Sequence, residues 1–156
     1  MRVLDLACGE GRHSLPAALL GADVVGVDRD ETRLATAREL AATHEVSVEW
    51  RVVDLEGAWP ELGRFDAVLV FNYLDRARIP EIRDLVAPSG MLMMESFLTG
   101  QRELGWGPAS ENHLLHPGEL SGLVAPLRIL HGREVLEPID AERCRAVASV
   151  VAVASE

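Results

Sequence analysis

The sequence predicts an α/β fold in which helices flank a doubly wound, mostly parallel sheet of seven strands whose last strand is antiparallel. Short β-favouring runs alternate with helical stretches, the inner runs are almost continuously apolar, and too few residues for a helix join the last two runs. Alternation favours a parallel sheet, and continuous apolar runs favour strands buried on both faces. The short final connection favours antiparallel neighbours.

The first five elements follow from local signals. Strands are expected at residues 3–7, 22–28 and 46–54, and helices at residues 12–21 and 30–44. Pro16 near the start of the first helix and Gly21 at its end occupy the places that these residues favour. Asp30 can cap the second helix, along which apolar residues recur at helical spacing, namely Leu34, Ala37 and Ala41.

The second half continues the alternation. Strands are expected at residues 65–72, 91–97, 127–135 and 144–154, and helices at residues 79–90 and 117–126. Pro88 and Gly90 are expected to stop the helix at 79–90. Residues 56–64 are short and rich in turn residues, which predicts a loop or a single turn. A loop as long as 98–116 is usually functional or mobile, so the segment around Trp106 is either a lid over a site or a variable loop.

Length and composition restrict the function. The 156 residues predict one domain over 1–156, and 48% of them are hydrophobic, enough for a sizeable core. No apolar run approaches the roughly 20 residues that span a membrane, and the net charge of −10 disfavours nucleic acid as a partner. Cys8 and Cys144 have neither metal nor redox spacing, which favours a reducing, cytoplasmic setting. The absence of lysine excludes Schiff-base and P-loop lysine chemistry.

Polar residues and glycines stand where four consecutive strands of the predicted sheet end. The first strand contains Asp5 and runs into Gly9 and Gly11, and the next three end at Asp28, at Asp54 and at the stretch FNY. Ligands of open parallel sheets bind beyond these carboxyl ends. Glycines allow a tight turn and close approach of the backbone to a ligand. A carboxylate at Asp28 can accept both hydroxyls of a ribose; the alternative is a helix cap, for which Asp30 is better placed.

The ligand that these residues indicate is an adenosine compound that carries positive charge and no phosphate. The dinucleotide motif G-x-G-x-x-G fails, because Ser14 stands at its third glycine position. Asp5 beneath the turn repels phosphate and attracts a cation. S-adenosylmethionine fits this description.

The sequence resembles the class I S-adenosylmethionine-dependent methyltransferases, which have a Rossmann-like fold. The resemblance is carried over essentially the whole chain by VLDLACGEGR at 3–12, Asp28, VVDLE at 52–56, FDAVLVFNYLDR at 65–76 and the closing strand pair. The small-molecule enzymes of the tellurite-resistance and thiopurine type are the most similar. The chain departs from the family in the Ala7-Cys8 pair and in the helices that usually precede the first strand. For their absence from this sequence we expect one of three causes, namely a fragment, a start placed too late or a pocket left open.

The resemblance implies a set of cofactor contacts. Asp5, Ala7, Gly9 and Gly11 would lie against the methionine part and Arg12 near its carboxylate. Asp28 would bind the ribose, and Arg29 would lie beside the adenine. Asp54 and Leu55 would meet the edge and face of the adenine, and Phe71 and Asn72 would line the far side near the methionine amine. The remaining partner expected is a small-molecule acceptor.

Methyl transfer needs positioning and a dry site, and it needs a general base only if the acceptor must lose a proton. Candidate bases are Tyr73, Glu95, His113 and His116. No third ligand accompanies the two histidines, so no metal site is expected. One alternative is a non-catalytic protein that binds S-adenosylmethionine. The other is an NAD-dependent oxidoreductase, which Asp5 and Ser14 disfavour. FNYL after the fourth strand, in place of an NPPY-like motif, disfavours amino-group methylation of nucleic acid or protein glutamine.

Overall fold

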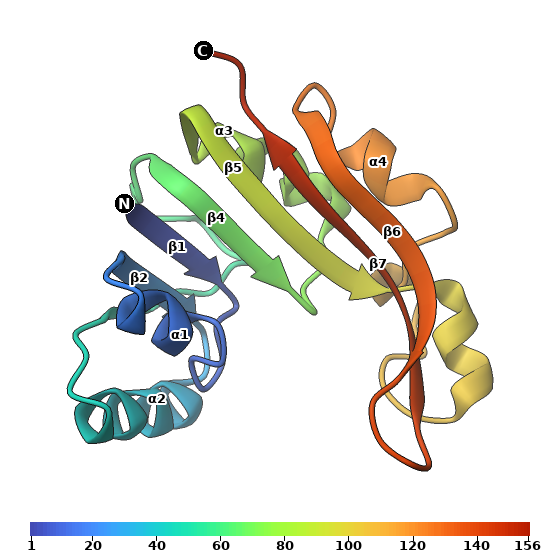
Figure 1. The fold of residues 1–156 in the computed structure, drawn as a ribbon, viewed down its shortest axis with the longest axis horizontal. Coiled ribbons are helices and arrows are strands. Elements are labelled where there is room, and N and C mark those ends of the chain that lie inside the picture. The colour runs from blue at the N-terminus through green and yellow to red at the C-terminus, as the bar shows by residue number, and fades with distance from the viewer.

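A computed structural model describes all of residues 1–156 and shows one seven-stranded sheet with helices on both faces (Figure 1). The strands are β1 (Arg2–Leu6), β2 (Asp23–Asp28), β3 (Glu49–Val52), β4 (Phe65–Phe71), β5 (Val86–Phe97), β6 (Arg128–Pro138) and β7 (Cys144–Val153). The α-helices are α1 (Ser14–Leu19), α2 (Glu31–Thr43), α3 (Ile79–Asp84) and α4 (Glu119–Leu123). Three short 3₁₀ helices complete the set, η1 (Arg76–Arg78), η2 (Thr99–Leu104) and η3 (Glu111–His113).

The strand order is β3-β2-β1-β4-β5-β7-β6. The first five strands pair in parallel, whereas β7 is antiparallel to both β5 and β6. This arrangement confirms the predicted fold class, including the antiparallel last strand. The order reverses between β1 and β4, and an open parallel sheet binds its ligands at such a reversal.

The end of α3 and the start of β5 both differ from the prediction. The helix expected at 79–90 ends at Asp84, and β5 begins at Val86 instead of at residue 91. The register between β4 and β5 shifts at this start, where Ser89 has a φ of 59°. A Cβ on Gly90 would lie 2.8 Å from the carbonyl oxygen of Ala87. The expected helix stop at Pro88 and Gly90 is therefore wrong, because the helix ends before both residues and they belong to the bulged start of β5.

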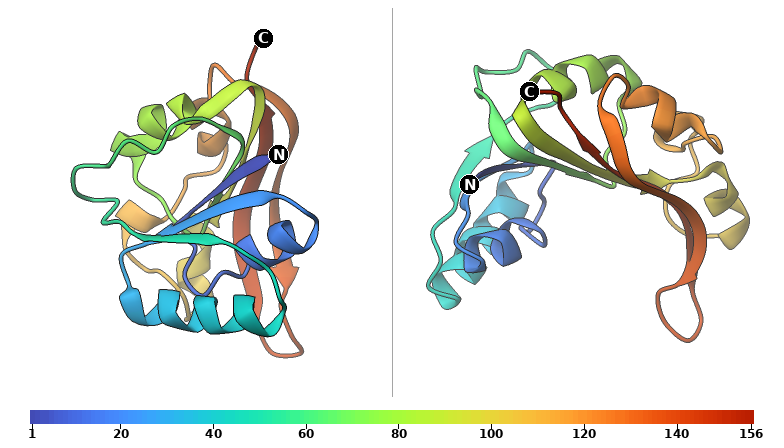
Figure 2. Two further views of the ribbon diagram at one scale, coloured as in Figure 1. Left: turned by 90° about the vertical axis from the view of Figure 1, so that its left-hand side faces the viewer. Right: turned by 45° about the horizontal axis from the view of Figure 1, so that its top comes forward.

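The remaining differences concern edges and connections. The edge strand β3 is shorter than the expected 46–54, because its pairing with β2 stops where Asp28 faces Val52. The helix expected at 117–126 is reduced to α4, which follows Gly118 at a φ of 80°. At the other edge β6 reaches Pro138, and Figure 2 shows β6 and β7 extending past the rest of the sheet as a curved hairpin.

The core lies mainly on one face of the sheet. Side chains of β1, β4, β5 and β7 pack there against α3 and α4, through residues such as Leu4, Val68, Ile82 and Leu120. A smaller apolar cluster on the other face packs against α1. In Figure 1 no helix lies in front of β4, β5, β7 and β6. None of the helices combines the length and the apolar character that crossing a bilayer requires.

Candidate active site

A cleft of about 960 Å³ lies at the carboxyl ends of β1, β2 and β4. Ten of the eleven predicted cofactor residues line it, namely Asp5, Ala7, Gly9, Arg12, Asp28, Arg29, Asp54, Leu55, Phe71 and Asn72. The remaining one, Gly11, does not. The topology therefore gathers residues from four separate stretches of sequence at one site, as the strand-end argument predicts.

The turn after β1 forms the floor of the cleft. Ala7 and Gly9 have φ angles of 56°, in the left-handed region that glycine adopts readily and alanine rarely. The Cys8 amide donates to the Val27 carbonyl oxygen at 3.0 Å, and the Gly9 amide donates to Oδ2 of Asp28 at 2.8 Å. The turn is thus fastened to the end of β2. Left-handed backbone at a non-glycine residue is typical of functional sites.

Asp28 is buried and connects two elements. Its second oxygen, Oδ1, accepts the Asp30 amide at 3.0 Å. The cap of α2 is Asp30, whose Oδ1 accepts the amides of Thr32 and Arg33. The cap reading of Asp28 is therefore wrong, and the cap expected at Asp30 is confirmed. Each carboxylate oxygen has two lone pairs, so Asp28 retains acceptor capacity toward the cleft.

Asp5 lies beneath the turn, where only 1% of its surface is exposed. Burial raises the pKa of its carboxyl group to about 6, although Ser14 Oγ donates to Oδ2 at 2.6 Å and Arg12 lies nearby, which both lower it. The group is consequently ionised at neutral pH and has no basic side chain paired with it. A buried carboxylate of this kind favours a cationic ligand.

Gly11 belongs to the tight turn that was predicted, and it also leaves space for Trp50. Its φ is +81°, and a Cβ there would lie 2.7 Å from Cη2 of Trp50, on β3. Gly26 on β2 meets the same indole, with a Cβ position 2.6 Å from Cζ3. Gly11 is therefore required by the turn and by the packing of Trp50, and it does not line the cleft.

The ends of β2 and β3 supply an apolar surface with charges at its rim. Val53 and Leu55 are buried and line the cleft. Asp54 is exposed, and its Oδ1 accepts the Glu56 amide at 3.0 Å. Arg29 pairs with Glu56 at 3.2 Å. An apolar face beside a carboxylate suits a flat, hydrogen-bonding ring such as a purine.

The end of β4 forms the opposite wall. Asn72 has a φ of 58° and donates its amide to the Glu95 carbonyl oxygen at 2.9 Å. The His13 ring stacks on Phe71, with centroids 3.9 Å apart. Nε2 of His13 and the hydroxyl of Tyr73 are buried without hydrogen-bond partners. Burial lowers the pKa of His13 and raises that of Tyr73 to about 12, so both side chains are neutral at pH 7.

The four candidate bases separate into two pairs. Tyr73 and His113 line the cleft. Glu95 lies outside the lining, where it pairs with Arg145 at 2.9 Å, and exposed His116 pairs with Glu111 at 2.9 Å. Neither of the latter two faces the cleft, because β5 directs Glu95 toward the β6–β7 hairpin and His116 lies at the outer end of its loop.

Trp106 does not cover the site. Its Nε1 donates to the Cys144 carbonyl oxygen at 2.9 Å, and its ring meets Phe97 edge-on at 6.0 Å. The same loop nevertheless contributes Pro108, Asn112 and His113 to the cleft. The loop therefore lines the cleft through these three residues, whereas the lid expected at Trp106 is not seen.

Sequence reasoning missed several lining residues. They include His13, Arg33, Leu74, Arg76, Phe97, Pro108 and Asn112. Leu74 and Arg76 lie two and four residues beyond the predicted strand 65–72, so extending that strand-end motif by four residues finds both. No local pattern marks Arg33 or Asn112, which reach the cleft from α2 and from the long loop.

Comparison with known proteins identifies relatives. Residues 3–90 match the family described as a methyltransferase domain. Over 96 residues the chain is 33% identical to the ubiquinone biosynthesis O-methyltransferase of Roseobacter denitrificans, covering 58% of this chain and 39% of that protein. The enzyme of the same description from Sinorhizobium fredii is 35% identical over 100 residues, covering 60% and 40%. The chain thus spans about two fifths of the length of these curated relatives.

Solved structures share the fold. TehB from Haemophilus influenzae superposes with a TM-score of 0.82 at 21% identity, covering 99% of this chain and 57% of that one. An S-adenosylmethionine-dependent methyltransferase from Methanosarcina mazei gives 0.79 at 18% identity, covering 99% and 92%. With more than half of its residues in the matched family region, the chain belongs to the methyltransferase domain family, whose cofactor is S-adenosylmethionine.

Proposed function

We propose that the cleft binds S-adenosylmethionine and that the domain transfers its methyl group to a small molecule. The observation that carries this proposal is the 2.8 Å bond from the Gly9 amide to the Asp28 carboxylate. Dinucleotide sites present the amides of the glycine turn to a pyrophosphate. Here the Gly9 amide is already satisfied by an acid, and ionised Asp5 lies below it. This donor set fits a sulfonium compound with a ribose and disfavours NAD.

The proposed contacts follow the cleft from end to end. Asp28 accepts the ribose hydroxyls, Leu55 packs on the face of the adenine with Asp54 and Arg29 at its edge, and Arg12 meets the methionine carboxylate. Asp5 lies under the methionine ammonium, with Phe71 and Asn72 beyond it. When bound, the cofactor supplies an already activated methyl group. The residues of the chain bind it, orient it and exclude water, which is the larger part of catalysis in such a transfer.

Four residues line the end of the cleft that we assign to the acceptor. Phe97 and Pro108 are apolar, and Asn112 and His113 carry hydrogen-bonding groups. Tyr73, with its pKa of about 12, suits donation of a hydrogen bond better than removal of a proton. His113 is therefore the base that we propose for an acceptor that must lose one. The net charge of −10 supports a partner other than nucleic acid, and the free cysteines support a cytoplasmic location.

Calorimetry with S-adenosylmethionine, S-adenosylhomocysteine and NAD⁺ tests the ligand. We expect both adenosyl compounds to bind and NAD⁺ not to bind. Asp28→Asn should weaken the binding of S-adenosylhomocysteine by about tenfold or more, since a charged acceptor is lost. The amide oxygen that replaces it can still accept from Gly9. Asp30→Asn is the matched control, because this neighbouring acid caps α2 and does not line the cleft.

Methyl transfer is then measured by mass spectrometry with 3,4-dihydroxybenzoate, 2-mercaptobenzoate and benzylamine as probes for oxygen, sulfur and nitrogen acceptors. A methylated product establishes an enzyme. Cofactor binding without any product would favour the non-catalytic alternative, and binding of NAD⁺ in place of S-adenosylhomocysteine would overturn the proposal.

A further inference from the structure

The loop before α4 contributes a wall of the cleft, which the proposed function assigns to the acceptor. We call residues 105–118 the strap. Leu114 and Leu115 are fully buried, and the Leu115 amide donates to the Phe97 carbonyl oxygen at 2.8 Å. Pro108, which precedes these anchors by several residues, and Asn112 and His113, which adjoin them, reach the cleft. The position of this wall therefore depends on what holds the strap beside its buried anchor.

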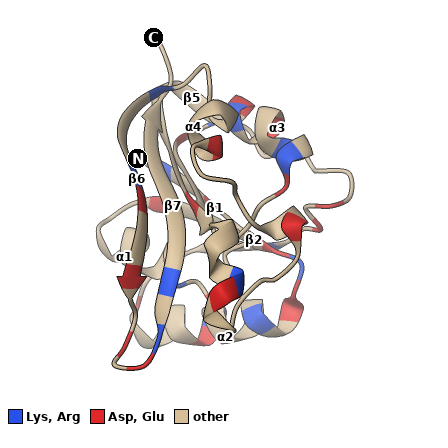
Figure 3. Ribbon diagram, turned by 90° about the vertical axis from the view of Figure 1, so that its right-hand side faces the viewer, with Lys and Arg blue, Asp and Glu red and all other residues tan.

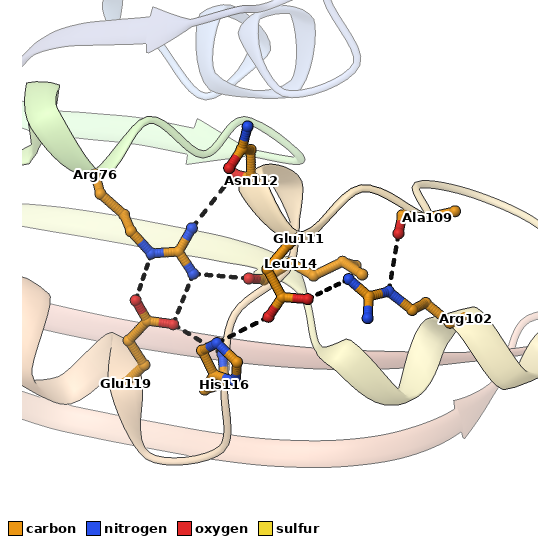
Figure 4. A network of polar contacts seen from close by, with 8 residues as sticks. All are labelled: Arg76, Arg102, Ala109, Glu111, Asn112, Leu114, His116 and Glu119. Carbon is orange, nitrogen blue, oxygen red and sulfur yellow. Dashed lines mark hydrogen bonds and ion pairs between the residues drawn. The ribbon is translucent and has the colours of Figure 1, made fainter.

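Arg76 reaches the strap from the other side of the cleft (Figure 4). It lies in η1, five residues after the end of β4, and Asp75 caps that turn by accepting the Ala77 amide. Its Nη2 donates to the Leu114 carbonyl oxygen at 2.8 Å, and its Nη1 donates to that of Asn112 at 3.4 Å. No other hydrogen bond in the structure joins residues 72–78 to the strap.

Glu119 holds the guanidinium of Arg76 in place. Its two carboxylate oxygens accept from Nε and Nη2 at 2.5 and 2.8 Å, and its Oε2 also accepts the His116 amide at 2.8 Å. The charge-assisted bond raises the pKa of Arg76 and lowers that of Glu119, so the pair stays ionised. One planar guanidinium thus joins the β4–α3 connection, the strap and the start of α4, which a lysine cannot do.

A second arginine secures the outer side of the strap. Arg102 donates through Nε to the Ala109 carbonyl oxygen at 2.8 Å and contacts the Glu111 carboxylate, which also meets His116 (Figure 4). These groups are exposed and lie away from the cleft, so they contribute less than the partly buried Arg76 pair. Arg76 is accordingly the one residue of the β4–α3 connection that is hydrogen-bonded to the strap.

We propose that Arg76 is a positioning residue that fixes the strap as the acceptor wall of the cleft, so that its loss weakens acceptor use and leaves cofactor binding intact. This inference rests on the proposed methyltransferase function, because it assigns the strap to the acceptor. Glu119 makes the assignment testable. It does not line the cleft, so an effect of a Glu119 variant on the acceptor cannot come from direct contact.

The experiment compares Arg76→Lys, Arg76→Gln and Glu119→Gln with the control Arg38→Lys. The Arg38 pair with Glu31 lies on the exposed side of α2, outside the cleft and away from the strap. Hydrogen exchange of the strap should accelerate by about tenfold or more in all three variants and remain unchanged in the control. The Kd of S-adenosylhomocysteine should change by less than about twofold. With the acceptor probe that the wild type methylates fastest, KM for the probe should rise and KM for S-adenosylmethionine should not.

Several results would overturn the inference. If hydrogen exchange of the strap is unchanged in both Arg76 variants, Arg76 does not hold the strap in place, whether or not a probe is methylated. Equal increases in both KM values would place Arg76 in the cofactor site. Weaker binding of S-adenosylhomocysteine with unchanged hydrogen exchange of the strap would do the same. Failure of the wild type to bind S-adenosylhomocysteine is a separate result, which refutes the proposed function and leaves the exchange measurement to report on the strap.

Discussion

Asp5 is the residue at which stability and function oppose each other. Its carboxyl group is buried and titrates near pH 6 in the folded chain, against 3.8 for the unperturbed group. Between these values the folded state retains a proton that the unfolded state releases. The stability contributed by this group is therefore present at low pH and is lost as pH rises toward 6. A shift of this size corresponds to about 3 kcal/mol at neutral pH.

Asp5→Asn should accordingly raise the free energy of unfolding at pH 7, by on the order of 1–3 kcal/mol. The amide oxygen can still accept from Ser14, while the buried charge is removed. In calorimetry the wild type should lose affinity for S-adenosylhomocysteine by up to about tenfold from pH 7.5 to 5, as Asp5 loses its charge. Methylthioadenosine, which lacks the ammonium, is the matched ligand and should show little change. An equal pH dependence for both ligands, or one that persists in Asp5→Asn, would contradict the assignment.

Individual site residues could be predicted from the sequence where they stand at the end of a predicted strand. Asp28 follows an apolar run, and the topology alone brings it to Gly9. Its bond to the Gly9 amide could not be read from spacing, because that bond depends on the left-handed turn at Ala7. The packing of Trp50 against Gly11 could not be predicted either, because Trp50 lies 39 positions further along the sequence.

At the scale of elements, Trp50 joins β3 to β2 and to the glycine turn. Its indole occupies the space over Gly26 and Gly11, so these glycines keep the edge strand close to the sheet. Gly26→Ala introduces a Cβ 2.6 Å from Cζ3 of Trp50 and 3.2 Å from Sγ of Cys8. We expect this overpacking to lower the free energy of unfolding by about 1–3 kcal/mol in urea denaturation.

Two further variants make this measurement specific. Trp50→Phe removes the ring atoms that a Cβ at Gly26 would meet, so the cost of Gly26→Ala should shrink in that background. A cost that stays constant would show that the indole is not its cause. Gly122→Ala in α4 is the control; nothing lies within 4 Å of its Cβ position, and it should be neutral or slightly stabilising.

Element types were predicted better than element ends. Apolar periodicity identified each strand and the long helix α2 because those signals are local. The lengths of the short helices α3 and α4 were overestimated. The bulge at Ser89 and the turn at Gly118 override the local helical propensity there. The strap had no local signature at all, because the guanidinium of Arg76 and the buried Leu114 and Leu115 hold it in place.

For the whole molecule, the open face of the sheet carries a charge network that ties the hairpin to the parallel strands. Glu95 on β5 has a side chain that is only 9% exposed, and it pairs with Arg145 at 2.9 Å and with Arg133 at 3.6 Å. Glu137 on β6 pairs with the same two arginines. Figure 3 shows acidic and basic positions interspersed along this hairpin. Hydrophobic patterning could predict the sheet but not this network, because it depends on the register of β6, β7 and β5.

Glu95→Gln should therefore lower the free energy of unfolding by about 1–3 kcal/mol, since it removes a buried charge and leaves half-buried Arg145 and exposed Arg133 with one carboxylate. Asp140→Asn, which weakens an exposed pair in the hairpin turn, should lower the free energy of unfolding less than Glu95→Gln does. Because Glu95 lies outside the cleft, its variant should retain the wild-type affinity for S-adenosylhomocysteine and, at a temperature where it is folded, the wild-type methyl transfer. Loss of transfer at unchanged stability would instead make Glu95 a base, and the open face of the sheet would then belong to the active site.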